Sequence, residues 1–95
     1  MTDEEMASLI MSGISAQGEG LHEKSIKIFT QFISLGSDPD ELAIAYSSRG
    51  ESYMAIGQRE KAIDDMKKAA DYGDEIILEA LRDEFGIIYT PKKLR

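Results

Sequence analysis

Few side chains in the 95-residue sequence are of the types that do covalent or metal chemistry. There is no cysteine, which rules out a disulfide, a thiolate nucleophile and a cysteine-based zinc site. His22 is the single histidine, whereas metal and acid–base sites commonly combine several such groups. Ser47 and Ser48 have no histidine near them in the sequence to activate a hydroxyl. We therefore expect no catalytic residues, no metal site and no cofactor, and we predict that the protein is not an enzyme.

Carboxylates in the second half of the chain are the remaining candidates for metal binding. They stand at Asp64, Asp65, Asp71 and Asp74. A calcium-binding loop places oxygen donors at alternate positions and ends in a glutamate, and the spacing here lacks both features. We interpret these carboxylates as surface charges and caps of helices.

The composition describes a small acidic domain. Eleven Lys and Arg stand against 18 Asp and Glu, which gives a formal net charge of −7. Such a surface repels phosphate backbones and anionic lipids, so we expect no nucleic acid and no membrane as partner. No apolar run approaches the length that spans a bilayer, and the residues from Met1 to Glu5 are acidic where a secretory signal would be basic. The resulting expectation is a cytoplasmic protein.

An internal repeat is visible when the sequence is compared with itself. A shift of about 37 residues, a period in the range of helical repeats, superposes a set of identical residues. Several of them are glycines, which tolerate the left-handed backbone conformation at the end of a helix. The matches indicate a duplicated unit. They include Asp3-Glu4 on Asp40-Glu41, Gly13 on Gly50, Ser15 on Ser52, Gly20 on Gly57, Glu23-Lys24 on Glu60-Lys61, Ile26 on Ile63 and Gly36 on Gly73.

Each unit is predicted to hold two helices, because its apolar residues recur at three- and four-residue steps. A fifth helix follows, with Asp74 placed as its cap. We expect an all-α fold in one domain over 1–95: repeat one at about 3–36, repeat two at about 40–73, a capping helix at about 74–86 and a flexible tail at 87–95. The predicted buried stripe of the capping helix is Ile76, Ile77, Ala80, Leu81 and Phe85.

The second unit resembles the tetratricopeptide repeat. Small residues at Gly50 and Ala62 let two helices approach closely, and larger side chains fill the space between them. The first unit fits less closely, since Phe32 stands where that family prefers a small residue. Ser12 and Arg49 stand where it prefers an aliphatic one. The residues that carry the resemblance are Tyr46, Gly50, Tyr53, Gly57, Ala62, Met66 and Ala69.

The resemblance implies a right-handed helical-hairpin repeat, an α–α superhelix of two repeats plus a capping helix. Members of this family bind proteins or peptides in a concave groove lined by the first helix of each repeat, and they are not catalytic. One subgroup grips the C-terminal carboxylate of heat-shock chaperones with lysines and asparagines, which are missing from the groove positions here. By position, the partner-binding groove of this chain consists of Ala7, Ile10, Met11, Ile14, Gln17, Ile44, Ser47, Ser48, Glu51 and Met54.

The sequence leaves two functions open. The first is an adaptor or small chaperone-like module whose apolar groove binds a peptide or an amphipathic helix of a protein partner. The second is a self-associating structural module, a homodimer through an exposed end of the stack, because two repeats are fewer than the three that such arrays commonly need. The isoleucines Ile10, Ile14 and Ile44 can also be core residues rather than groove residues.

Overall fold

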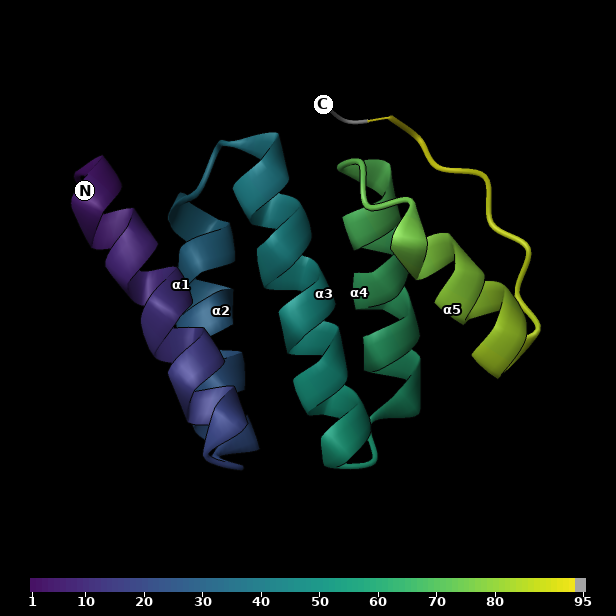
Figure 1. Cartoon of the computed structure of the whole chain (residues 1–95), viewed down its shortest axis with the longest axis horizontal. Helices are drawn as coiled ribbons and strands as arrows, with labels where there is room; N and C mark the ends of the chain where they lie inside the picture. The colour runs from purple at the N-terminus through teal and green to yellow at the C-terminus, as the bar shows by residue number, and fades with distance from the viewer. Residues whose placement is uncertain (94–95) are drawn as a thin grey trace.

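The computed structural model describes residues 1–93 as five α-helices followed by an extended C-terminal segment (Figure 1). No strand occurs in this part of the chain, so the predicted all-α class is confirmed. None of its helices combines the length and the apolar character that a bilayer crossing requires. The helices are α1 (Asp3–Gly18), α2 (His22–Leu35), α3 (Pro39–Ala55), α4 (Arg59–Asp71) and α5 (Ile76–Phe85).

Consecutive helices pack on one another along the chain. α1 packs on α2, α2 on α3, α3 on α4 and α4 on α5, with a smaller contact between α1 and α3. Figure 1 shows α3 in the middle of the row, between the α1–α2 pair and the α4–α5 pair. This arrangement of neighbouring helices agrees with the predicted helical-hairpin repeat.

Side-chain caps mark the start of α1 and α3. The hydroxyl of Thr2 accepts a hydrogen bond from the amide of Glu5, whose carboxylate accepts one from the amide of Thr2. Asp38 caps α3 by accepting hydrogen bonds from the amides of Asp40 and Glu41, which follow Pro39. Asp74, the expected cap of the last helix, accepts a hydrogen bond of 3.2 Å from the amide of Ile77, and α5 begins at Ile76.

The turns within the two hairpins have the same geometry. Gly20 and Gly57 both adopt a φ of +79°, a left-handed conformation that favours glycine. In each turn the next residue, Leu21 or Gln58, donates its amide to the carbonyl five residues earlier, at 2.9 and 2.8 Å. The superposition of these glycines at an offset of about 37 therefore corresponds to one turn used twice.

Two glycines mark the places where the helices of each hairpin come closest. A Cβ added to Gly13 of α1 would lie 2.7 Å from the ring of Phe29 in α2. A Cβ added to Gly50 of α3 would lie 3.3 Å from the backbone oxygen of Ala62 in α4. Glycine at these positions allows a large aromatic ring in the first hairpin and a close backbone contact in the second.

The hydrophobic core lies where the first hairpin meets α3. Phe29 and Phe32 are fully buried there, and the rings of Tyr46 and Tyr72 stack at its edge with centroids 5.9 Å apart. Three of the four buried apolar residues of α4 are alanines, so α4 packs closely on α3. The core cluster consists of Ile10, Phe29, Phe32, Leu42 and Ala45, with Met6, Leu9, Ile33, Tyr46 and Tyr72 packed against it.

The segment that follows α5 contacts the end of α4. The hydroxyl of Tyr89 donates a hydrogen bond of 2.8 Å to the carboxylate of Asp71, and the amide of Lys92 donates one of 2.8 Å to the same oxygen. Burial of the phenol and its hydrogen bond to Asp71 raise the pKa of Tyr89. The flexible tail predicted for 87–95 thus includes residues with defined contacts, and its last two residues, 94 and 95, lie outside the described residues.

Candidate interaction surface

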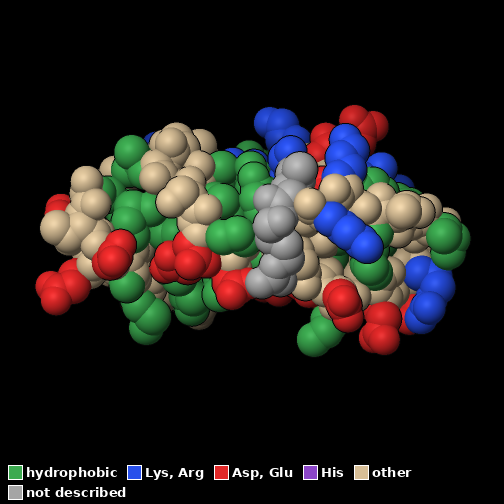
Figure 2. Space-filling model, turned by 90° about the horizontal axis from the view of Figure 1, so that it is seen from above, with side chains coloured by type: hydrophobic (Ala, Val, Ile, Leu, Met, Phe, Trp, Pro, Cys, Tyr) green, Lys and Arg blue, Asp and Glu red, His purple; other side chains and the backbone are tan. Residues whose placement is uncertain are grey.

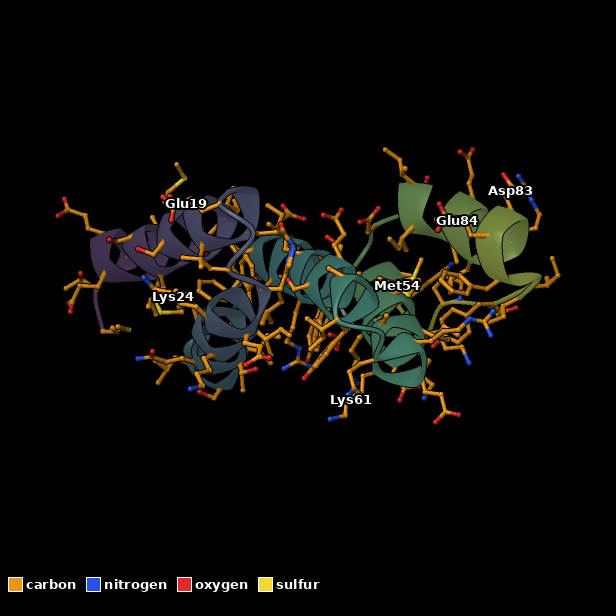
Figure 3. All side chains as sticks on the ribbon, turned by 90° about the horizontal axis from the view of Figure 1, so that it is seen from below. Glu19, Lys24, Met54, Lys61, Asp83 and Glu84 are labelled. Atoms are coloured by element: carbon orange, nitrogen blue, oxygen red, sulfur yellow. The ribbon has the colours of Figure 1, made fainter. Side chains whose placement is uncertain are left out.

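The residues predicted to line a groove belong to α1 and α3, the first helices of the two hairpins. Figure 3 shows α1 and α5 on the same side of the molecule, with α3 between them and with α2 and α4 towards the opposite side. We call the side of α1 and α5 the open face. Helical spacing puts Ile14 on the same stripe of α1 as Gln17, which bonds to α3, and puts Ile44 and Met54 on the same stripe of α3 as Ser47 and Glu51, which border α5. Ile14, Ile44 and Met54 are each between 41 and 45% exposed, so a ligand has apolar surface to bury there.

The five groove positions predicted on α1 have different environments. Ala7 and Ile14 are exposed, while Ile10 is only 8% exposed and belongs to the core cluster. The side chain of Ile10 thus packs against Phe29 and its neighbours and is not available to a ligand, which corrects its assignment to the groove. Met11 is 65% exposed and lines a hollow between α1 and α2. Gln17 points towards α3.

Gln17 joins α1 to α3 through a polar network in the core. Its side-chain amide donates hydrogen bonds of 2.6 Å to the backbone oxygen of Ser48 and 2.9 Å to the hydroxyl of Ser52. Ser52 also shares a hydrogen bond of 2.6 Å with Ser25 of α2, and both serines are fully buried. These bonds connect three helices at one point, so Gln17 has a role in holding the open face together.

The groove positions on α3 form one stripe along that helix. Ile44 and Met54 are exposed, Ser47 and Ser48 are half-buried, and Glu51 is exposed. The hydroxyl of Ser47 donates to the backbone oxygen of Ile44 within the same helix. Ser48 faces α1 through Gln17, whereas Ser47, Glu51 and Met54 line a cavity shared with α5. The stripe therefore forms the floor between the two outer helices.

The cavity between α3 and α5 has a volume of about 290 Å³ and is open to solvent on one side. Its walls are largely apolar, and the two carboxylates at its border come one from each helix. A volume near the lower limit of small-molecule sites suits one or two side chains of a peptide. The lining residues are Ser47, Gly50, Glu51, Met54, Met66, Ile77, Ala80, Glu84 and Phe85.

The contribution of α5 to this cavity was missed at the level of sequence, where its apolar residues were predicted to be a buried stripe. Leu81 is fully buried, as predicted, but Ile77, Ala80 and Phe85 are only half-buried because they border the cavity. Ile76 is 80% exposed, so its assignment to the buried stripe is wrong. α5 packs mainly on α4, which leaves the first turn of its apolar face without cover.

Arg49 links three helices on the side of α3 that faces α2 and α4. Its guanidinium donates two hydrogen bonds to Asp65 of α4, at 2.7 and 2.8 Å, and one of 3.1 Å to the hydroxyl of Thr30 in α2. The rings of Tyr46 and Tyr53 lie 5.5 and 5.6 Å from it. The hydrogen bonds to Asp65 raise the pKa of Arg49, while burial raises the pKa of Asp65 against their lowering effect. A charge therefore occupies a position where the repeat pattern prefers an aliphatic side chain.

Three of the four carboxylates considered for calcium have partners within the chain. Asp65 binds Arg49, Asp71 accepts hydrogen bonds from the C-terminal segment, and Asp74 caps α5, whereas Asp64 is exposed. Among residues 1–93, no three side chains of His, Asp or Glu come together in a way that could hold a metal ion. Asp65, Asp71 and Asp74 thus stabilise the fold through contacts within the chain.

A second hollow lies at the N-terminal end of the helix row, between α1 and α2. It has a volume of about 680 Å³ and is wide open to solvent. Residues of α1 and of the start of α2 line it, and no residue of α3 does. Figure 3 shows Glu19 and Lys24 of its border at the α1 end of the molecule, away from α5. It is formed by Ser8, Leu9, Met11, Ser12, Ser15, Ala16, Glu19, Lys24 and Ile28.

Comparison with known proteins gives a partial relative. Over 51 residues the chain is 45% identical to the DnaJ homolog subfamily C member 7 homolog of Schizosaccharomyces pombe. The match covers 54% of this chain and 10% of that protein, so the chain is similar to a small part of its relative. No family model matches the chain, and no solved structure matches it significantly.

Proposed function

We propose that the chain is a non-catalytic protein-interaction module of the tetratricopeptide-repeat type, an adaptor or small chaperone-like protein that binds a peptide or helix on the open face. The observation that carries the proposal is the exposure of Ile14, Ile44 and Met54 on two neighbouring helices. A partner helix would bury these side chains together and release the water that covers them. Because the net charge is −7, the proposed partner is a protein and not a nucleic acid or a membrane.

The similarity to part of a DnaJ homolog supports the chaperone-like form of this proposal. Since the chain spans about a tenth of that relative's length, nothing of the relative's whole activity transfers to it directly. What the chain shares with that segment is 45% identity over 51 residues, and the exposed surface of this chain's own helices is the part available for binding.

Ile14→Glu tests the groove. The side chain is 41% exposed, so the variant should keep the helical circular dichroism of the parent while a charge enters the proposed interface. Ile88→Glu is the matched control, because Ile88 is 81% exposed and lies in the segment after α5. The three proteins are immobilised and exposed to lysate of the source organism. We expect one protein to be retained by the parent and by Ile88→Glu, and to be lost by folded Ile14→Glu.

Two outcomes would contradict the groove. In one, the retained protein binds Ile14→Glu as strongly as the parent. In the other, Ile88→Glu loses it to the same extent, so that the effect follows from added charge alone. Titration calorimetry with the purified partner measures the affinity of the parent and of each variant. Loss of one isoleucine that is buried in the complex should weaken binding by about tenfold or more.

The second candidate function is self-association through the hollow between α1 and α2. Met11 is 65% exposed at its border, and no helix covers this end of the row. Two copies meeting there would extend the stack and bury both hollows. Sedimentation over a wide range of protein concentrations tests this, because a dimer dissociates on dilution. A monomer mass at all concentrations argues against it, and Met11→Glu should abolish a dimer that Ile88→Glu leaves intact.

A further inference from the structure

The charges of this protein are divided between the two sets of helices. α1, α3 and α5 carry nine Asp and Glu against two Arg, whereas α2 and α4 carry five against six Lys and Arg. The helices of the open face thus have a net charge of −7, equal to that of the whole chain, and the other two helices have +1. In Figure 2 most acidic side chains lie along the lower edge, the side of the open face, and most Lys and Arg lie above and to the right.

The two arginines on the open-face helices are already engaged. Arg49 pairs with Asp65 of α4, and Arg82 pairs with Asp83, its neighbour in sequence. Neither cation is therefore available to neutralise the carboxylates that border the α3–α5 cavity. The negative potential of this side is directed at solvent, where an approaching ligand meets it first.

Glu51 and Glu84 flank the cavity from opposite helices. Both are exposed, and within residues 1–93 neither takes part in a hydrogen bond or an ion pair. Arg59 of α4 lies 5.0 Å from the ring of Phe85, does not line the cavity, and forms no ion pair with either glutamate. Figure 3 shows Met54 and Glu84 towards the open side and Lys61 on the opposite side. The cavity thus combines an apolar floor with two free anions.

We propose that the α3–α5 cavity docks a cationic amphipathic helix of a partner protein. Apolar side chains one turn apart enter between Met54 and Phe85, and lysines or arginines beside them pair with Glu51 and Glu84. The choice of a cationic partner rests on charge complementarity, since an acidic helix would meet nine carboxylates and no free cation on α1, α3 and α5. This inference rests on the proposed function and names the chemistry of its ligand.

Designed peptides test the inference with defined probes. Three peptides of about 18 residues, or five turns, are used. Two share a leucine face and carry either lysine or glutamine on the other face, and the third is the lysine peptide with its leucines scrambled. Binding to the full chain is measured by calorimetry and mapped by NMR shifts at Ser47, Met54 and Ile77. We expect the lysine peptide to bind tightest, and its affinity to fall as the salt concentration rises from about 0.02 to 0.5 M.

Two charge variants locate the interaction. The double variant Glu51→Gln with Glu84→Gln should bind the lysine peptide with an affinity roughly three- to thirtyfold lower than that of the parent. Its affinity for the glutamine peptide should be unchanged. The matched control, Glu60→Gln with Asp64→Asn, removes the same charge from exposed positions of α4. It should change the affinity less than twofold. An equal loss in both variants would mean that net charge alone attracts the peptide, which overturns the proposed site.

The outcomes separate this inference from the proposed function. If the glutamine peptide binds as well as the lysine peptide and shifts the same residues, the groove binds helices but the cationic preference is wrong. If no peptide shifts Ser47, Met54 or Ile77, both the inference and the peptide-binding function fail. Sedimentation of the chain alone identifies a different occupant: self-association that is lost in the Glu51 and Glu84 variant would assign the cavity to a second copy and overturn the proposal.

Discussion

The hydroxyl groups of Ser25 and Ser52 lie 2.6 Å apart in the core, and neither residue is exposed to solvent. Ser52 also accepts a hydrogen bond from Gln17, so α1, α2 and α3 meet at this one hydroxyl. Buried polar groups are costly when they lose their partners, because the dry surroundings offer no substitute. The first hairpin is therefore fixed against α3 by specific hydrogen bonds as well as by apolar packing.

Ser52→Ala should lower the free energy of unfolding by about 1–3 kcal/mol, since Ser25 and Gln17 each lose a hydrogen-bond partner. Ser15→Ala is the matched control, because Ser15 stands at the same place in the first repeat and is exposed. Its effect should stay within about 0.5 kcal/mol. Urea unfolding followed by circular dichroism measures both. Equal stabilities for the two variants would show that the network contributes little.

Arg49→Ala should lower the free energy of unfolding by about 3 kcal/mol, because it leaves the carboxylate of Asp65 buried without its partner. The double variant Arg49→Leu with Asp65→Leu should be more stable than Arg49→Ala, since it removes both charges and fills their space with apolar atoms. Thermal and urea unfolding of the parent and both variants compare these effects. A double variant less stable than Arg49→Ala would mean that the ion pair itself stabilises the fold.

Gly13→Ala should destabilise the protein by about 1–3 kcal/mol, because the added methyl group would lie 2.7 Å from the ring of Phe29. Gly18→Ala is the control in the same helix, where no atom lies within 4 Å of the added Cβ. That change should be neutral or stabilise by up to about 1 kcal/mol. Unfolding curves that place Gly13→Ala at or above the stability of Gly18→Ala would contradict the close approach of α1 and α2.

The contact of Tyr89 with Asp71 should be lost at alkaline pH. The pKa of Tyr89 is raised above its ordinary value of about 10, so the folded protein holds the phenolic proton more tightly than the unfolded chain does. The stability from this contact is therefore fully present below about pH 10 and is lost as the pH rises through the raised pKa. The tyrosinate absorbance of the parent minus that of Tyr89→Phe isolates this titration. A midpoint at or below pH 10 would contradict the hydrogen bond.

Much of the local structure could be predicted from sequence because it depends on short-range rules. Gly20 and Gly57 were matched by their offset alone, and both turns have the same backbone angle. Asp74 was expected to cap the last helix, and it accepts a hydrogen bond from the first turn of α5. Such features need only a few neighbouring residues, which is why a single sequence reveals them.

The contacts that shape the candidate site depend on distant residues and could not be predicted in the same way. Gln17 and Ser52 are 35 positions apart, and nothing in the local pattern pairs them. The periodicity of α5 identified an apolar face without showing that Ile76 would lie beyond the reach of α4. The resemblance to the tetratricopeptide repeat placed Ile10 among the groove positions and left a core role open, because a rotation of α1 by part of a turn decides between groove and core.

Packing between consecutive helices has a consequence for how the molecule opens. α3 has neighbours on both sides, whereas α5 packs mainly on α4 and α1 has no helix on its outer side. Local opening should therefore start at the two ends of the row and reach the middle last. Amide hydrogens of α5 and of the start of α1 should exchange with deuterium first, and those of α3 should persist until the whole chain unfolds.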